Sequence, residues 1–465
     1  MPAGDDRRLR PPPGAWEPGR QAVVRLVRPV EEFLRTEVAG AVALLVAAAV
    51  ALGWANSPWR HHYAALWAYE LRLGIGPFDV VWPLRAVVDD GLMTLFFFVV
   101  GLEIRREMHR GELSAPRRAA LPLAAALGGM IAPALIYLAI NRGTAHASGW
   151  GVPMATDIAF AVGVLTLLGR RAPPALRILL LALAIIDDVG AILVIGLFYS
   201  GSFAPIGLAI AAGGVALVLG LQRLGVRRTL PYVLPASIVW YGCHRAGIHP
   251  TLAGVVVGLL TPPVAWYGTP GLIEVATRTV GDIERASDPH AVAEHLDALD
   301  AARREAVAPV DRLQHQLHPW VALLVMPLFA LANAGVTVAE IDPSAVPWRL
   351  VAGVVFGLVV GKPLGILAGS WVSTRLGIAA MPRGLGWAGI AVVGMVGGIG
   401  FTMSLFMAEL AFHDPRDHDF ARLSILLAST AAAILGAAFG RSVLPARSAI
   451  GTAPSESDAE GSTAA

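Results

Sequence analysis

The sequence is poor in charge and nearly free of cysteine and lysine. Its single cysteine, Cys243, cannot form a disulfide within the chain, so the fold does not depend on an oxidising compartment. Charged residues make up only 15% of the chain, whereas soluble domains usually carry about 25%. Hydrophobic residues reach 55% and are gathered in long runs. These shortages argue against a soluble globular domain and indicate a membrane protein.

The apolar runs are long enough to cross a bilayer as helices, which takes about 18 or more residues with few charges. Short segments of alternating polar and apolar residues are missing, so the pattern does not fit a membrane β-barrel. The sequence therefore predicts an all-α polytopic membrane protein with twelve transmembrane helices. The predicted spans are residues 37–55, 88–107, 119–140, 149–169, 175–199, 203–222, 230–243, 251–261, 319–336, 350–371, 384–412 and 420–440.

The arginines of the connections predict the orientation of these spans. Connections numbered oddly from the N-terminus hold 27 arginines, and the even ones hold 8. Because positively charged loops stay on the cytoplasmic side, both termini are predicted to be cytoplasmic.

The chain thus divides into three parts. Residues 1–36 form a cytoplasmic N-terminal extension without the apolar core of a signal peptide, and residues 37–440 form the transmembrane domain. A long cytoplasmic loop at 262–317 contains a predicted polar helix at 291–307. Residues 441–465 form a small, polar cytoplasmic tail that is predicted to be disordered. Residues 71–81, outside the membrane, fit either a small hairpin or a plain loop.

Two adjacent carboxylates, Asp187 and Asp188, stand near the middle of the fifth span, where an ionisable group is costly and therefore indicates a functional site. Neighbouring residues on a helix point about 100° apart, so the two carboxylates cannot aim at one point. One is expected to face a site and the other a partner. The alternative, a helix-end cap or a solvated kink, fits poorly with the long apolar runs on either side.

Asp157 stands in the fourth span beside Thr156 and shortly after Pro153. Proline removes a helical hydrogen bond, so the helix is predicted to break near Thr156 and Asp157. Such a break frees carbonyl oxygens beside a hydroxyl and a carboxylate, which are the ligands a hard cation prefers. Asp157 can also cap the second half-helix, and the two roles are compatible.

Lys362 is the only lysine in the chain and lies inside the tenth span. Arginine does not release its proton in proteins, whereas buried lysine titrates readily. The sequence leaves open whether Lys362 carries a proton or forms a structural salt bridge.

Glycines interrupt the eleventh span, with Gly398 and Gly400 among four glycines in seven residues. They predict a second helix break, although close helix packing through small residues is the alternative. Two interrupted spans in corresponding places predict inverted repeats, spans 3–5 matching spans 10–12, with the interrupted helices 4 and 11 crossing. Asp157 would then offset the positive half-helix ends at the crossing, and Lys362 the negative ones.

Charged residues at the membrane edges indicate a function less specifically than the buried ones do. Asp89 and Asp90 mark the outer end of the second span, and Glu103 and Glu107 mark its inner end, where they fit either a cation funnel or an interfacial anchor. Candidates for titration near neutral pH, each of which can equally be structural, are His249, His315 and His318.

Several motifs together resemble the bacterial NhaA-type sodium/proton antiporters, over residues 37–440. The motifs are GLEIRRE at 101–107, ATDIAF at 155–160, IIDD at 185–188, HPW at 318–320, ANAG at 332–335, GKPLG at 361–365 and GFTMS at 400–404.

This resemblance implies an electrogenic, pH-regulated exchange of Na⁺, and of Li⁺, for a larger number of protons, serving sodium and pH homeostasis. It implies a transporter and not an enzyme, with no cofactor beyond the transported ions and no nucleic-acid partner. The protein is expected to lie in the bacterial inner membrane, in contact with its lipids. It is also expected to form a homodimer joined through the external hairpin.

The resemblance also implies residue roles. Asp157 and Asp188, with Thr156 nearby, would bind the metal ion and the protons, and Asp187 would pair with Lys362. His249 and the region 314–318 are similar to positions tied to pH response. Gln314 departs from the glutamate usual in that region, so the same pH sensor is in doubt here.

Two other functions compete with exchange. An intramembrane aspartyl protease also needs two membrane carboxylates, but its Gly-x-Gly-Asp pattern is missing from the chain. A proton-coupled solute symporter is the other alternative.

Overall fold

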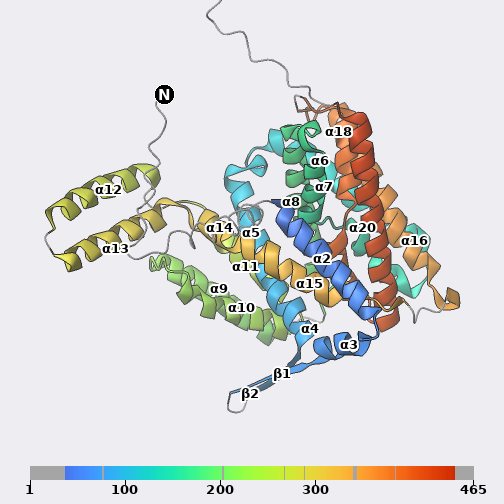
Figure 1. The fold of residues 1–465 in the computed structure, drawn as a ribbon, viewed down its shortest axis with the longest axis horizontal. Helices are drawn as coiled ribbons and strands as arrows, with labels where there is room; N and C mark the ends of the chain where they lie inside the picture. The colour runs from blue at the N-terminus through green and yellow to red at the C-terminus, as the bar shows by residue number, and fades with distance from the viewer. Residues whose placement is uncertain are drawn as a thin grey trace, which may run out of the picture.

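The computed structural model describes residues 37–445 except 76–77, 202–203, 266–267, 287, 339–342 and 383. The N-terminal extension at 1–36 and the tail from 446 onward lie outside the described residues. Helices dominate the described part of the chain, and the strands form one two-stranded sheet. Figure 1 shows the helices gathered in one body, from which a helical hairpin and the strand hairpin project.

Seven of the described helices are long and apolar enough to cross a membrane. Short π-helical turns lie inside two of them without breaking them. The seven are α2 (Glu37–Ala55), α6 (Pro116–Asn141), α8 (Pro174–Phe198), α9 (Pro205–Arg223), α14–η6–α15 (Pro309–Trp320, Val321–Val325, Met326–Asn333), α16–η9–α17 (Trp348–Phe356, Gly357–Gly361, Lys362–Arg375) and α20 (Pro415–Val443).

Two further spans are formed by bent helix pairs, which brings the number of candidate spans among the described residues to nine. The 3₁₀ helix η3 (Ala145–Met154) and α7 (Ile158–Leu167) meet at 48°, and α18 (Trp387–Gly397) and α19 (Phe401–Ala411) meet at 49°. Both predicted helix breaks are therefore confirmed. Unlike the others, the half-helix before Asp157 is 3₁₀ and not α.

The three remaining predicted spans coincide with helices that are too charged or too short to count as spans on composition alone. One is the run of α4 (Leu84–Ala86), η1 (Val87–Leu92) and α5 (Met93–Arg110). The others are α10 (Val233–Arg245) and α11 (Thr251–Leu260).

The extramembrane segments are small. Of the two options for residues 71–81, the hairpin is present: β1 (Glu70–Ile75) pairs antiparallel with β2 (Phe78–Pro83), after the short helix α3 (Arg60–Ala68). In the long loop, α12 (Gly268–Arg285) and α13 (Pro289–Ala306) pack together and project from the body, at the left of Figure 1. The predicted polar helix is α13. Single turns of 3₁₀ helix are η2 (Glu112–Ser114), η4 (Gly169–Arg171), η5 (Leu230–Tyr232) and η8 (Pro343–Ala345).

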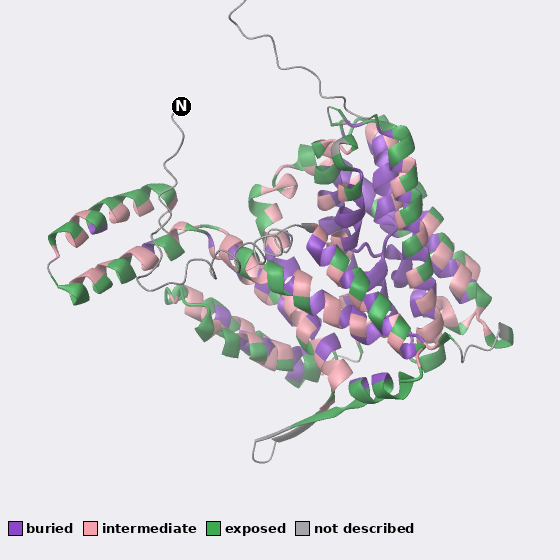
Figure 2. Ribbon diagram, viewed as in Figure 1, coloured by how far each residue is buried: buried purple, intermediate pink, exposed green. Residues whose placement is uncertain are grey.

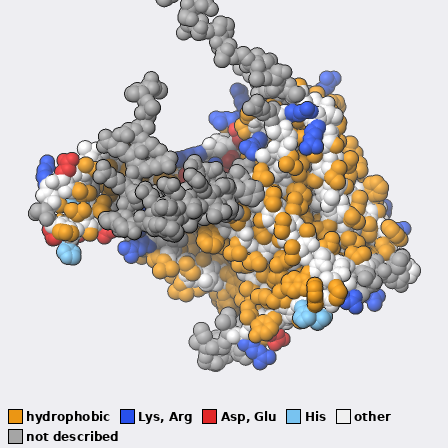
Figure 3. Space-filling view, in the orientation of Figure 1, with side chains coloured by type: hydrophobic (Ala, Val, Ile, Leu, Met, Phe, Trp, Pro, Cys, Tyr) orange, Lys and Arg blue, Asp and Glu red, His pale blue; other side chains and the backbone are white. Residues whose placement is uncertain are grey.

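Burial is concentrated where the bent helices cross, as the buried interior around α7, α18 and α20 in Figure 2 shows. The face in Figure 3 is covered mainly by hydrophobic side chains, with arginines toward its margins, as expected of a surface that faces lipid. Small residues bring α6 and α17 into backbone contact: a Cβ on Gly128 would lie 2.1 Å from the carbonyl oxygen of Gly365. This contact fixes α17, and with it Lys362, against the centre of the body.

Candidate functional site

The two helix breaks cross and are joined by backbone and side-chain hydrogen bonds. The amide of Asp157 donates to the carbonyl oxygen of Ile399 over 2.7 Å. The hydroxyl of Thr156 lies 3.0 Å from the carbonyl oxygen of Gly397, the last residue of α18. Groups that a continuous helix would pair internally are thus satisfied across the crossing.

The glycines of the second break serve the close approach and not an unusual backbone conformation. Gly398 and Gly400 both have ordinary right-handed helical angles. A Cβ on Gly398 would lie 2.5 Å from the carbonyl oxygen of Leu358, and one on Gly400 would lie 3.1 Å from that of Ala155. A larger residue at 398 would push the break away from η9, and one at 400 would push it away from Ala155 at the other break.

Asp157 lies at the positive ends of two half-helices. Its carboxylate caps α7 by accepting a hydrogen bond of 3.0 Å from the amide of Phe160. The other carboxylate oxygen accepts from the amide of Thr402 at 3.2 Å and from the hydroxyl of the same residue, in the first turn of α19. The side chain is 1% exposed. The predicted capping role is confirmed, and the carboxylate offsets two helix N-termini at once.

Asp187 and Lys362 form a fully buried ion pair. The Lys362 Nζ lies 2.8 Å from Asp187 Oδ2, and the two side chains are 0% and 1% exposed. The hydroxyl of Thr156 donates to the same Asp187 oxygen over 2.8 Å. Lys362 Nζ also donates to the carbonyl oxygen of Met154 at the end of η3. The predicted pairing is present, and Lys362 meets a negative half-helix end as expected.

Asp188 lies on the same uninterrupted helix, α8, but makes different contacts. It is 3% exposed, and within the described part of the chain no side chain or amide donates a hydrogen bond to it. Its carboxylate interacts electrostatically with Glu103, Asp157 and Asp187. The alternative of a helix-end cap is excluded, because α8 continues for ten residues beyond it.

The structure therefore places Asp157, Asp188 and the Asp187–Lys362 pair together in one buried region at the crossing. Among the described residues, no group of three or more His, Cys, Asp or Glu side chains is arranged to hold a metal ion tightly. The oxygens on offer are two carboxylates, the Thr156 hydroxyl and carbonyls at the breaks. This set suits transient binding of a hard monovalent cation better than a resident metal.

Two of the candidate pH-response residues, Glu103 and Glu107, lie in the second half of α5. Glu107 accepts a hydrogen bond of 2.8 Å from the amide of Glu112, and Glu103 is partly buried one turn nearer the site. Arg106 donates to Gln314 over 3.1 Å, which ties α14 to this end of α5. The side chains of His315 and His318 are exposed on α14.

His249 lies apart from them, in the turn between α10 and α11. Its Nε2 is 3.7 Å from a carboxylate oxygen of Asp90, and its ring meets the ring of Phe406 edge to face. Asp90 in η1 and Glu103 in α5 are separated by 13 residues, or about 20 Å along the run of the two helices. Burial, with a smaller contribution from nearby His244, lowers the pKa of His249 to about 4.

Sequence reasoning missed the roles of Thr402 and Arg422. Thr402 belongs to the motif at 400–404, but only the crossing shows that it touches Asp157. Arg422 lies near the start of the predicted span 420–440 and is 5% exposed, since α20 begins already at Pro415. Two of its partners come from α19 and α15, so sequence spacing could not find them.

Two broken helices that cross at a cluster of buried charges, inside a body of apolar helices, define a secondary transporter. The family follows from comparison with known proteins. A family model described as "Na+/H+ antiporter 1" matches residues 31–439, and the chain belongs to this family.

Its relatives resemble it over almost their whole length. The chain is 53% identical to the Na(+)/H(+) antiporter NhaA 2 of Sorangium cellulosum, over 97% of this chain and 98% of the relative. It is 50% identical to the Na(+)/H(+) antiporter NhaA 2 of Myxococcus xanthus, over 97% of each chain. It is also 50% identical to the Na(+)/H(+) antiporter NhaA of a Janthinobacterium species, over 92% of this chain and 96% of the relative. It is thus a multi-pass membrane transporter and not an enzyme.

Proposed function

We propose that the chain exchanges Na⁺, and also Li⁺, for protons across the bacterial inner membrane through a site formed by Asp157 and Asp188. Family membership supports the exchange of these two ions. The observation that supports the site assignment is the burial of both carboxylates in one charged region near the crossing of the broken helices.

The chemistry of exchange follows from competition for the same oxygens. Two ionised carboxylates in one buried region repel each other, so the region is stable only with a cation or with protons bound. Sodium binding displaces the protons, and protonated carboxylates no longer hold sodium. A site that opens alternately to each side then exchanges the ions without a leak. With two carboxylates releasing protons for one cation, the exchange is electrogenic.

The twelve-span architecture with inverted repeats belongs to this proposal. Nine spans follow from length and composition, and the three other helices lie where spans were predicted. In both halves a broken span stands between two unbroken ones: η3–α7 between α6 and α8, and α18–α19 between α17 and α20. This correspondence supports repeats 3–5 and 10–12.

We further propose cytoplasmic termini, contact with membrane lipids, and a homodimer joined through β1 and β2. The arginine distribution supports the orientation. The sheet contains only these two strands within the described residues, so each strand has an edge open for pairing with a second copy. Replacing residues 71–81 by a short glycine-serine linker should yield monomers in light scattering of the purified protein.

Regulation by pH is proposed to act at the cytoplasmic end of α5, through Glu103, Glu107, His315 and His318. Gln314, bonded to Arg106, ties this end of α5 to α14 without a titratable group of its own. His249 is proposed to act separately, on the extracellular side of the site, where it contacts Asp90 and Phe406.

The decisive experiment follows a pH-sensitive dye in inside-out vesicles that hold a proton gradient. Sodium or lithium should release the gradient, and an organic solute should not. Release by a solute alone would favour a symporter. An intramembrane protease would show no ion-driven release at all.

Asp188→Asn tests the site itself. The substitution keeps the shape and removes the charge, so we expect a folded protein without sodium-dependent proton movement. Retained exchange would show that Asp188 does not belong to the ion site. The matched control is Glu70→Gln on the exposed hairpin, which should behave as wild type.

A further inference from the structure

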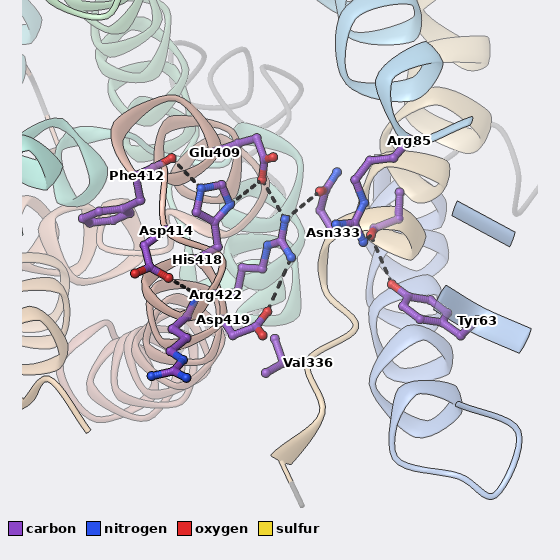
Figure 4. A network of polar contacts seen from close by, with 12 residues as sticks. Tyr63, Arg85, Asn333, Val336, Glu409, Phe412, Asp414, His418, Asp419 and Arg422 are labelled. Carbon is purple, nitrogen blue, oxygen red and sulfur yellow. Dashed lines mark hydrogen bonds and ion pairs between the residues drawn. The ribbon is translucent and has the colours of Figure 1, made fainter. Parts of the chain in front are cut away.

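A second polar network lies beyond the ion site, at the other end of α19. It joins the last turn of α19, the first turns of α20 and the end of α15, as Figure 4 shows. A hydrogen bond from Asn333 extends it to Asp89 in η1. Arg422 is at its centre. The guanidinium lies 2.7 Å from a carboxylate oxygen of Glu409 and 3.4 Å from the side-chain oxygen of Asn333. The side-chain nitrogen of Asn333 donates a hydrogen bond of 2.6 Å to a carboxylate oxygen of Asp89.

His418 completes this network with two contacts that both demand a donor. Its Nδ1 lies 3.1 Å from the Glu409 carboxylate oxygen that also binds Arg422, and its Nε2 contacts the carbonyl oxygen of Phe412. A carbonyl oxygen and an ionised carboxylate can only accept hydrogen bonds. Both ring nitrogens must therefore carry hydrogen, so this arrangement is that of a positively charged imidazolium.

Other charged groups near His418 contribute to the electrostatics of this network. Asp419 lies 3.6 Å from Arg422 on α20, and Asp417 is paired with His146 over 3.1 Å. Arg85 approaches from α4 and donates to the carbonyl oxygen of Ala332. The charged groups that interact with His418 are Glu409, Arg422 and Asp419, and Arg85 interacts in turn with Asp419.

The network is coupled to the ion site through α19. Thr402, at one end of this helix, contacts Asp157, and Glu409 stands seven residues later, about 10 Å along the axis. The helix between them is continuous and almost wholly buried. A change in how the outer end is held therefore moves the contact with Asp157.

We propose that His418 is a positioning residue that makes exchange sensitive to the pH outside the cell. Protonated, it holds Glu409 and the Phe412 carbonyl together and clamps α19 against α20. When the external pH rises and the ring loses a proton, one of its two acceptors loses its donor, and the outer end of α19 is released. Release lets the half-helix take part in opening the site outward, so exchange is faster at alkaline external pH.

This inference rests on the proposed exchange and orientation, and the test separates them. Proteoliposomes containing the full chain are held at one internal pH while the external pH is varied, and the initial rate of sodium-driven proton movement is measured. His418→Gln keeps a donor but carries no charge, so its rate should exceed that of the wild type at acid external pH and match it at alkaline external pH. His418→Arg carries a permanent charge, so its rate should fall below that of the wild type at alkaline external pH.

The controls decide among the outcomes. His413→Gln, on an exposed residue of the same turn, should keep the wild-type dependence on external pH. A wild-type dependence in His418→Gln would overturn the inference, whereas the absence of any exchange in the wild type would overturn the proposed function instead. If neither variant folds, hydrogen exchange of residues 405–412 in the wild type decides. Protection that does not fall as external pH rises, after correction for the intrinsic rate, would overturn the inference.

Discussion

The amide of Asp157 and the carbonyl oxygen of Ile399 are joined by a hydrogen bond of 2.7 Å, so the breaks of the two bent helices are held directly to each other. The same residue then directs its carboxylate at the first turn of α19, through the amide and hydroxyl of Thr402. Any movement of one half-helix is therefore transmitted to the carboxylate that we assign to ion binding.

Removing the Thr402 hydroxyl should weaken sodium binding. Thr402→Val keeps the shape but deletes one of the donors to Asp157, and a hydrogen bond to a charged group contributes about 1.5–3 kcal/mol. Because about 1.4 kcal/mol corresponds to a tenfold change, we expect the KM for sodium to rise roughly tenfold or more. Thr402→Ser retains the hydroxyl and should stay near wild type in the same vesicle assay. An unchanged KM in the valine variant would show that this contact does not support the ionised carboxylate.

His249 gives a prediction about pH with a definite sign. Burial holds the pKa of its ring at about 4, so in this conformation the ring is neutral above about pH 5. A conformation that exposed the ring would return its pKa toward the ordinary value of about 6.5, and protons would favour that conformation below this pH. His249→Gln should therefore alter the rate of exchange between about pH 4 and pH 6.5 and leave the profile above pH 7 unchanged. A shifted profile above pH 7 would show that His249 is exposed during most of the cycle.

Close contact between α6 and α17 predicts an intolerance of even one methyl group. Gly128→Ala would place its Cβ 2.1 Å from a backbone oxygen of Gly365, which no change of rotamer can relieve. Overpacking of this kind costs about 1–3 kcal/mol, so the midpoint of thermal unfolding in detergent should fall. Gly213→Ala is the matched control on α9, where a Cβ would meet no atom within 4 Å. Equal stability of the two variants would mean that α6 and α17 are further apart than described.

The helix breaks could be predicted from the sequence because their causes are local, whereas the pairing of Asp187 with Lys362 followed only from the family resemblance. Pro153 and the glycines at 398 and 400 disturb the helices that contain them. The residues alone left open whether Lys362 forms an ion pair or carries a proton. The hairpin could be anticipated only as one of two options, since its pattern covers few residues.

The partners that come from distant parts of the chain could not be predicted. Thr402 meets Asp157 only because two helices cross, and no spacing between residues 157 and 402 encodes the crossing angle. Arg422 lies near the start of the predicted span 420–440, where a charge resembles an interfacial one. Its burial depends on Glu409 and Asn333, which satisfy it from two other helices.

Whether Lys362 stabilises the fold or carries a proton can be decided by a double-mutant cycle with Asp187. Removing one partner of a buried pair leaves an uncompensated charge and typically costs about 3–5 kcal/mol. Lys362→Met alone should therefore lower the thermal midpoint of the purified protein strongly, and Asp187→Asn alone should do so too. The double variant leaves neither charge buried, so we expect it to recover much of the lost stability.

Transport by the double variant then separates the two roles. If the pair is structural, proteoliposomes with Asp187→Asn and Lys362→Met together should still exchange sodium for protons and still generate a membrane potential, because Asp157 and Asp188 remain. Electroneutral exchange by a stable double variant would instead make Lys362 one of the proton carriers. Lys362 Nζ is held by two protein acceptors, Asp187 and the Met154 carbonyl oxygen, which favours the structural role and an electrogenic double variant.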